Sequence, residues 1–449
     1  MSGDFTRRLE RLTSKIDVKL ILMVSLGLHL FAISFPRDAK VFDEAYYVPA
    51  ALDLLKLTPS NLEHPFLGKA WIALGIVFFG DNWFGWRISS VVFGVLSLYV
   101  FYRLSLHLIP PILATYGTLL LALENMFFIH SSLALLEVPS IFFGLFALFL
   151  YFSRRYYWAA LSLGLSVLSK ETGILFFLTL STYHIIRHRP SLVSLGGLKK
   201  PLIFLIIMLG TILLPMTAYD LAYQPQASFV QVVVTEYRDP GDTLVSRATT
   251  TETRLSMAPI TNALEHIRYI VGYASSLTIG RQDNLNAGNY AWSWILPAPY
   301  TYPPSVYYAV SVNKTIIEQK DGAQTVRSIL TQPIAWIAVG NMPIWWSIWI
   351  TVPVAACMLA RRRSTQAEPL LLSWIGATYL PMLFLSFGPQ RIVYPFYFLN
   401  TIPALTLGIP YLATFLLADR RLLSLGLITY SIIVLFFFAA YYPVRIFEQ

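Results

Sequence analysis

Long apolar runs alternate with short polar segments along the whole chain. Most of these runs are long enough for a helix to cross a bilayer, which takes about 20 residues. Their spacing predicts about eleven transmembrane helices, and therefore an all-α polytopic membrane protein. The expected spans are residues 16–35, 86–106, 109–131, 138–152, 156–169, 173–186, 201–219, 334–359, 370–387, 392–417 and 422–440.

The basic residues predict the orientation of these spans. Cytoplasmic loops carry an excess of Lys and Arg, and basic clusters occur at residues 7–15, 154–155, 187–189, 199–200, 361–363 and 420–421. This places the N-terminus in the cytoplasm and the loop after the first span outside. Two apolar stretches in that loop, Pro49–Leu57 and Pro65–Phe79, are predicted to be interfacial helices. If Pro65–Phe79 crossed, the later basic clusters would face outward.

Composition supports a membrane protein and excludes other classes. The 449 residues are 56% hydrophobic and 13% charged, with a net charge of +9. The positive charge lies in short clusters between apolar runs, which does not indicate nucleic-acid binding. The single cysteine, Cys357, excludes an intrachain disulfide framework. The start of the chain lacks a cleavable signal pattern, so we expect the first span to be retained.

Three regions are expected along the chain. Residues 1–222 form a transmembrane core with the first external loop at residues 36–85. Residues 223–331 form a long external loop whose segment AWSWILPAPYTYPPSVYY is rich in the aromatic residues that settle at a lipid interface. Residues 332–449 form a C-terminal region of four spans. No internal repeat is visible.

Acids and cations from distant segments fall at the predicted external face. They are Asp43, Glu44, His64, Lys69, Arg87, Glu137, Lys170 and Arg391. Carboxylates beside cations suit a reaction in which a hydroxyl or amine attacks and a phosphate leaves, because the acid accepts the proton and the cations stabilise the phosphate. Lys69 could instead extend to lipid headgroups, and His64 could orient the loop. A transporter or lipid flippase fits less well, because transporters place ionisable groups near the midplane and often have duplicated halves.

Four motifs in order then resemble one known family. FDEAYY followed by EHPFLGK, in the first loop, is similar to the first external loop of the protein O-mannosyltransferases. ENMFFIHSSLALLEVPSIFF, LSKETGILF and GNMPIWWSIW resemble further segments of that family. The family's second proline is replaced by Phe66, a common Arg by Ser132 and a common Asp by Glu137, and the soluble MIR insert is absent. The lipid A aminoarabinose transferases are related and share the first-loop acid and the FGxR pattern of Phe84–Arg87.

The resemblance implies a GT-C type membrane glycosyltransferase. Such an enzyme would move one sugar, by resemblance mannose, from a polyprenyl or dolichyl phosphate to Ser or Thr hydroxyls of proteins on the external face, with inversion. A lipid or glycan acceptor is the alternative, and a flippase or transporter is the alternative of another class. The absent MIR insert favours an archaeal or bacterial source, and hence the cell membrane.

The resemblance also suggests roles for the residues. Asp43, with Glu44, would be catalytic, and the donor phosphate would contact Arg87, Lys170 and Arg391. Substrate-binding or supporting roles are expected for Glu63, His64, Lys69 and Glu137. No cofactor is required. A divalent metal held by Glu137 and Asp43 is left open, as are a hydrogen bond from Glu137 to the acceptor and a simple ion pair with a nearby cation.

Overall fold

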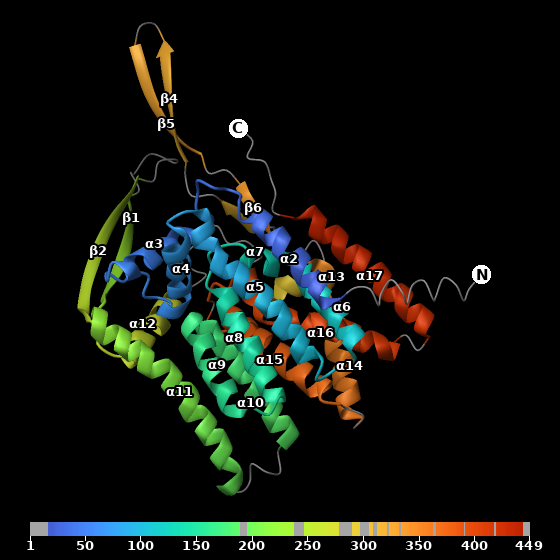
Figure 1. The fold of residues 1–449 in the computed structure, drawn as a ribbon. Coiled ribbons are helices and arrows are strands. Elements are labelled where there is room, and N and C mark those ends of the chain that lie inside the picture. The colour runs from blue at the N-terminus through green and yellow to red at the C-terminus, as the bar shows by residue number, and fades with distance from the viewer. Residues whose placement is uncertain are drawn as a thin grey trace.

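Helices packed side by side form the body of the protein (Figure 1). The computed structural model describes residues 17–188, 195–237, 247–277, 290–296, 305–308, 312–320, 323–331, 334–361, 365–389, 391–416 and 419–442. The α-helices are α2 (Val18–Ala32), α3 (Glu44–Leu55), α4 (Phe66–Phe79), α5 (Trp83–Ser105), α6 (Pro111–Ala122), α7 (Asn125–His130), α8 (Glu137–Phe152), α9 (Tyr156–Ser169), α10 (Ile174–His188), α11 (Leu195–Tyr223), α12 (Ala263–Ser276), α13 (Met342–Trp346), α14 (Ile348–Ala360), α15 (Ala367–Phe387), α16 (Ile402–Leu416) and α17 (Arg420–Ala440). Short 3₁₀ helices are η1 (Glu171–Gly173), η5 (Ala291–Ile295) and η6 (Pro395–Asn400).

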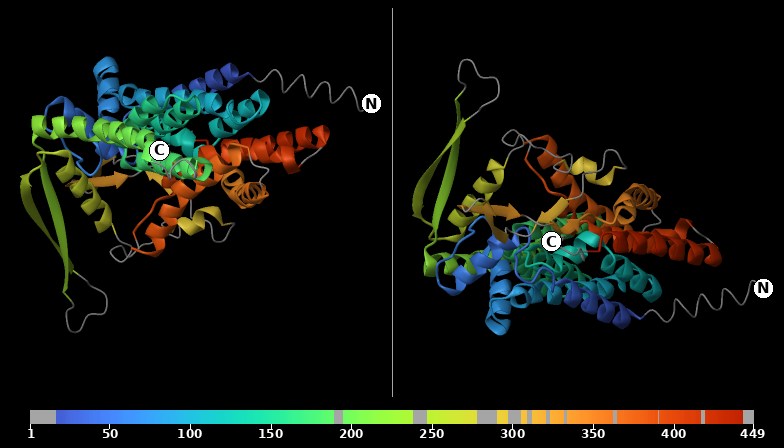
Figure 2. Two further views of the ribbon diagram at one scale, coloured as in Figure 1. Left: turned by 90° about the horizontal axis from the view of Figure 1, so that it is seen from below. Right: turned by 90° about the horizontal axis from the view of Figure 1, so that it is seen from above.

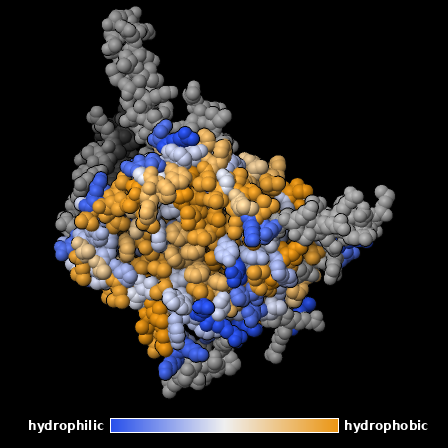
Figure 3. Space-filling view, viewed as in Figure 1, coloured by the Kyte–Doolittle hydropathy of each residue, from blue (hydrophilic) through white to orange (hydrophobic). Residues whose placement is uncertain are grey.

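The helices have the composition of membrane spans. Within the described residues, five helical stretches are long and apolar enough to cross a membrane: Trp83–Ser105, Lys199–Tyr223, Met342–Ala360, Ala367–Phe387 and Arg421–Ala440. Several shorter apolar helices accompany them. The face in Figure 3 carries a broad field of hydrophobic residues with hydrophilic residues gathered at its margins. The all-α polytopic class is confirmed, whereas the number of spans stays a prediction.

Several helix boundaries differ from those expected from hydrophobicity. The expected span 109–131 is divided into α6 and α7, because Glu124 accepts a hydrogen bond from the Phe127 backbone N–H and caps a new helix there. The first interfacial helix begins at Glu44 rather than Pro49, so that Pro49 lies inside α3. The second begins at Phe66, directly after Pro65, close to the prediction.

The segment expected to be an external loop contains antiparallel ribbons that the sequence analysis did not predict. Strand β1 (Gln226–Tyr237) pairs with β2 (Arg247–Pro259), and β4 (Val312–Lys320) pairs with β5 (Ala323–Thr331). The β1–β2 ribbon extends away from the helices (Figure 2). A third ribbon joins β3 (Ser305–Tyr308) to β6 (Ile334–Ala338), so the expected span 334–359 starts as a strand. Trp294 in η5 is fully buried rather than at a lipid interface.

The packing brings the turns of four helical segments to one end of the bundle. Helix α4 of the first loop packs on α8 and α9, while η1 packs between these two helices and α10. Helix α7 contacts α8 and η6. The beginnings of α3, α8 and η1 and the η6 segment are thereby held close together, although they are separated by up to several hundred residues of sequence.

Candidate active site

The Asp43 carboxyl group lies where these turns meet. Asp43 directly precedes α3, but its side chain makes no capping hydrogen bond to the helix. Its Oδ2 lies 3.4 Å from the hydroxyl oxygen of Tyr47, one turn further on. Burial raises the pKa of Asp43, and the charge of Lys170 offsets part of this effect; the other charged or titratable groups that act on it are Glu137, His64 and His130. The carboxyl group is half-buried and forms no ion pair within the described part of the chain, so it can accept a proton when ionised.

A buried ion pair lies beside Asp43. Lys170 follows the last residue of α9, and its Nζ donates a hydrogen bond to Oε1 of Glu137, the first residue of α8. Burial alone would lower the pKa of Lys170, but Glu137, Glu171 and Tyr397 together raise it. An ammonium group has three N–H donors, and Glu137 takes one of them. Lys170 can therefore still donate to an anion. Of the three roles considered for Glu137, namely a metal ligand, a hydrogen bond to the acceptor and an ion pair with a nearby cation, the structure contains the ion pair.

The segment around η6 completes the wall of the site. The Lys170 Nζ lies 5.4 Å from the ring centre of Phe396, a favourable cation–π distance. Arg391 donates through Nε to the Ala274 carbonyl and through Nη1 to that of Ile392, and it lies over the ring of Tyr397. Within the described residues, its other guanidinium N–H groups have no hydrogen-bond partner. The charges of Asp43 and Arg391 both act on Tyr394.

Sequence reasoning identified Arg391 but missed the aromatic residues that follow it. The signal available in the sequence was the run YPFYF, which begins three residues after Arg391. Taken as part of an apolar span, this run gave no reason to expect side chains facing a polar site.

Glu44 and Arg87 do not have the positions expected of catalytic and phosphate-binding residues. Both side chains are fully buried. The guanidinium donates twice to Glu44, at 2.8 and 2.7 Å, and its three remaining N–H groups donate to the carbonyl oxygens of Ile33, Pro36 and Ala39. All five donors of Arg87 are thus occupied.

Glu44 is satisfied as completely as Arg87. Besides the two bonds from Arg87, its oxygens accept hydrogen bonds from the backbone N–H groups of Val41 and Ala134, each at 2.8 Å. No donor remains for a phosphate and no lone pair for a substrate proton. We therefore correct both roles and infer that this pair fixes the first loop to α5 and to the segment before α8.

Lys69 and Glu63 support the loop. Lys69 is 3% exposed, and its Nζ donates to the carbonyl oxygens of Ser60, Asn61 and His64. These three acceptors occupy its donors, so of the two expected roles, substrate binding or support, this arrangement favours support. Glu63 accepts a hydrogen bond from the Asn61 side-chain amide at 2.9 Å. Both residues thus hold the turn that presents His64.

His64 joins the first loop to a residue that the sequence analysis did not select. Its Nδ1 lies 3.0 Å from Oε2 of Glu171, and its Nε2 lies 3.2 Å from the Tyr47 hydroxyl. Burial would raise the pKa of Glu171, but His64 and Lys170 together with a backbone hydrogen bond lower it to about 2. The position of Glu171 next to Lys170, in SKETG, was the signal that could have identified it.

Another acid and histidine, both buried, hold the same loop from the other side. Asp220 near the end of α11 lies 2.7 Å from Nδ1 of His266 in α12, whose Nε2 lies 3.0 Å from the Leu62 carbonyl oxygen. All three residues are buried. The α11–α12 region therefore fixes the position of the turn just before His64, and no local pattern in the sequence indicated this contact.

Two of the motifs quoted above are joined by hydrogen bonds. The Glu124 carboxylate accepts a hydrogen bond at 2.9 Å from the Asn341 backbone N–H and one at 3.0 Å from Nε1 of Trp345. Asn125 accepts a further one from the Asn341 side chain. These residues of ENMFF and GNMPIWW are buried away from Asp43 and connect α7 to α13, so we infer that they stabilise the fold.

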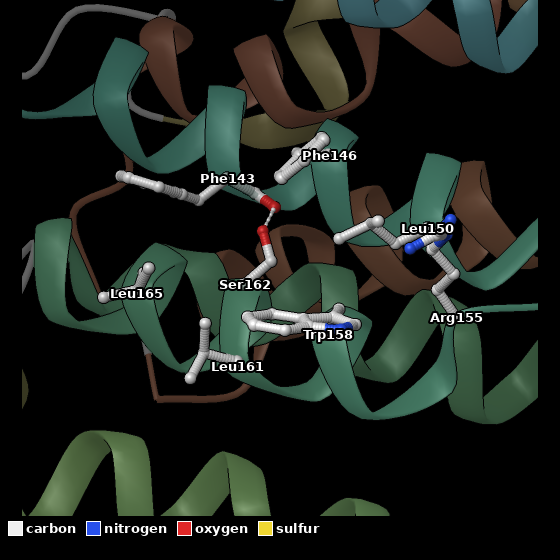
Figure 4. A pocket seen from close by; sticks show the side chains of 8 residues that line it. All are labelled: Phe143, Phe146, Leu150, Arg155, Trp158, Leu161, Ser162 and Leu165. Carbon is white, nitrogen blue, oxygen red and sulfur yellow. Dashed lines mark hydrogen bonds between the residues drawn. The ribbon is translucent and has the colours of Figure 1, made fainter. Parts of the chain in front are cut away.

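An apolar groove between α8 and α9 is separate from this site. Its lining includes Phe143, Phe146, Trp158 and Leu165, with Arg155 at one end, and its volume is about 180 Å³ (Figure 4). Ser162 in its wall donates to the Phe143 carbonyl oxygen. None of the acids around Asp43 lines the groove, and we assign it no part in the chemistry.

Comparison with known sequences finds similarity to one described family. Residues 63–219 match the sequence profile of the family described as dolichyl-phosphate-mannose-protein mannosyltransferase. The polyprenol-phosphate-mannose–protein mannosyltransferase of Mycobacterium tuberculosis is 26% identical over 504 aligned positions, covering 97% of this chain and 89% of the relative. The protein of that name from Mycolicibacterium smegmatis is 34% identical over 120 residues, which are 24% of this chain and only 23% of that relative.

Solved structures agree on the fold. The protein O-mannosyltransferase Pmt1–Pmt2 complex of Saccharomyces cerevisiae, bound to the sugar donor, gives a TM-score of 0.67 at 11% identity, covering 97% of this chain and 90% of that chain. ArnT from Cupriavidus metallidurans gives a TM-score of 0.53 at 13% identity, covering 95% of this chain and 75% of that chain. The chain therefore shares its fold with these two proteins. Over nearly its whole length the chain is similar to the mycobacterial protein mannosyltransferase, and residues 63–219 also match the family profile.

Proposed function

We propose that this chain is a membrane glycosyltransferase that moves a mannose from a polyprenyl or dolichyl phosphate to Ser or Thr hydroxyls of proteins. The observation that carries the proposal is the partly exposed Asp43 beside Lys170, an acid and a cation that both retain hydrogen-bonding capacity. The names of the relatives, which specify a polyprenol-phosphate-mannose donor and a protein acceptor, support this choice of substrates.

The proposed reaction is a single inverting displacement. The acceptor hydroxyl gives its proton to the Asp43 carboxylate as its oxygen attacks the anomeric carbon on the face opposite the phosphate. The bond from that carbon to the phosphate oxygen breaks, and Lys170 and Arg391 stabilise the departing phosphate. General-base assistance contributes about 10² to 10⁴ in rate, and fixed donors aimed at the developing charge contribute further.

The orientation of the site is part of the proposal. The basic clusters favour a cytoplasmic N-terminus and an external Asp43, in a cell membrane. Positive charge at Lys170 and Arg391 then lies on the face where cations are disfavoured by the orientation rule, which supports a binding role for them.

We propose that the chain's own cations, rather than a metal ion, neutralise the phosphate. Within the described residues, no group of three or more His, Cys, Asp or Glu side chains is placed to hold a metal, and Glu137 is bonded to Lys170. Transfer by the purified protein is expected to continue at an unchanged rate in excess EDTA. A loss of activity that Mg²⁺ or Mn²⁺ restores would contradict this.

The acceptor class is tested with the protein in lipid nanodiscs. Supplied with polyprenyl-phosphate-[³H]mannose and a Ser/Thr-rich peptide, it is expected to label the peptide, and the product is expected to be the inverted anomer. Separation of peptide from lipid products distinguishes the proposed acceptor from a lipid or glycan. Label that crosses a proteoliposome membrane without any transfer would instead indicate a flippase or transporter.

At acid pH, the rise of kcat/KM with pH is expected to follow the ionisation of the Asp43 carboxyl group. Burial raises the pKa of Asp43 above its ordinary value of 3.8, and the base must be ionised to accept a proton. The value of kcat/KM for peptide mannosylation should therefore rise with pH through a midpoint above 3.8. Glu171, with a pKa of about 2, does not produce a limb in this range. A rate independent of pH down to 3.8 would contradict the role of Asp43.

A further inference from the structure

Three side chains connect Asp43 to the protein surface in a continuous line. The Tyr47 hydroxyl lies 3.4 Å from Oδ2 of Asp43 and 3.2 Å from Nε2 of His64. The opposite ring nitrogen of His64 lies 3.0 Å from Glu171. These residues come from α3, from the turn before α4 and from η1, so the line exists only in the folded protein.

Exposure increases along this line. Tyr47 is 3% exposed, whereas the side chains of His64 and Glu171 are 19% and 34% exposed. Glu171 is ionised at neutral pH, because against the effect of burial His64, Lys170 and a backbone hydrogen bond lower its pKa to about 2. The outer end of the line is thus an anion in contact with solvent.

The other groups around Asp43 do not offer such a connection. Glu137 of α8 and Lys170 after α9 are bound to one another and are 5% and 2% exposed. His130 of α7 is fully buried beside Glu137. Tyr394, before η6, contributes a phenol group and no basic nitrogen. Among the described residues that act on Asp43, His64 therefore combines a basic nitrogen with exposure to water.

Each turnover of the proposed reaction leaves a proton on Asp43, and that proton must leave before the next turnover. We propose that Tyr47, His64 and Glu171 form the path by which it does so. This inference rests on the proposed function, in which Asp43 is the base. The Asp43 proton passes to the Tyr47 oxygen while the Tyr47 hydroxyl proton passes to Nε2 of His64. The imidazolium so formed is paired with Glu171 and gives a proton to water, which restores the Asp43 carboxylate.

Chemical rescue tests the path. In nanodiscs, with saturating polyprenyl-phosphate-mannose and peptide, His64→Ala is expected to lower kcat about tenfold or more, with a change in KM of less than about twofold for either substrate. Added imidazole should restore most of the rate, and a series of substituted imidazoles should restore it in the order of their basicities. A purely structural histidine would not give that dependence on basicity.

The matched control is His184→Ala. His184 lies in α10 and bonds to Tyr151, away from the Asp43 site, so its replacement should leave kcat unchanged and insensitive to imidazole. Tyr47→Phe removes one hydroxyl group and provides a second variant if His64→Ala does not fold. It is expected to lower kcat about tenfold and to change the solvent deuterium isotope effect on kcat.

The outcomes separate this inference from the proposed function. If Asp43→Asn is inactive but His64→Ala and Tyr47→Phe keep the wild-type kcat, the proton path is wrong, whereas the role of Asp43 as the base is retained. A slow, folded His64→Ala that imidazole does not restore would also overturn the path. If Asp43→Asn keeps full activity, the proposed base itself fails.

Discussion

Replacement of Asp43 by asparagine is expected to lower the rate of mannose transfer by about 10² to 10⁴-fold, the usual contribution of general-base assistance. Asparagine has nearly the same shape as aspartate and still accepts the Tyr47 hydrogen bond, but it cannot take up a hydroxyl proton. Binding of the polyprenyl-phosphate donor should be retained, because Lys170 and Arg391 are unchanged. Transfer is measured with labelled donor and peptide, and donor binding with the same donor in the absence of peptide.

Asp81→Asn is the matched control. Asp81 belongs to the loop between α4 and α5, and its Oδ1 accepts a hydrogen bond from Trp86 that an asparagine can also accept. This variant should transfer mannose at the wild-type rate. Ordinary activity in Asp43→Asn, or an equal loss in Asp81→Asn, would remove Asp43 from the role of base.

Replacement of Arg87 by methionine is expected to destabilise the protein by about 3–5 kcal/mol, as is typical when one partner of a buried ion pair is removed. The variant leaves the Glu44 charge buried without its partner and removes the donors from three backbone carbonyls. Thermal unfolding in nanodiscs should show a lower Tm. A phosphate ligand would behave differently, since its loss would raise the donor KM and leave the Tm unchanged.

Two further variants test this interpretation. Arg103→Met, at the exposed far end of α5, should change stability by no more than about 0.5 kcal/mol. The double variant Glu44→Gln, Arg87→Met should be less destabilised than the sum of the two single variants, because it no longer buries an unpaired charge. Strict additivity would argue against a coupled structural pair.

Hydrophobicity along the chain was sufficient to predict much of the helical architecture. The bounds of α9 agree with the expected span 156–169, and those of α8 and α15 differ by a few residues. Such helices depend on local composition and length. The boundary between α6 and α7 could not be predicted in this way, because Glu124 caps α7 and is itself held by Asn341 and Trp345, which lie more than 200 positions away. The ribbon of β3 and β6 likewise depends on pairing between separated segments.

The sequence by itself determined that this protein is a polytopic helical membrane protein, and its motifs indicated which loops carry acids and cations. Only the tertiary structure decided what each of those charged groups does. Arg87 and Lys170 are both buried cations paired with a glutamate, but all five donors of Arg87 are occupied, whereas Glu137 takes one of the three that Lys170 has. The physical reason is that a charged group's free hydrogen-bonding capacity depends on which distant backbone and side-chain atoms surround it. That environment is set by the packing of helices rather than by neighbouring residues in the chain.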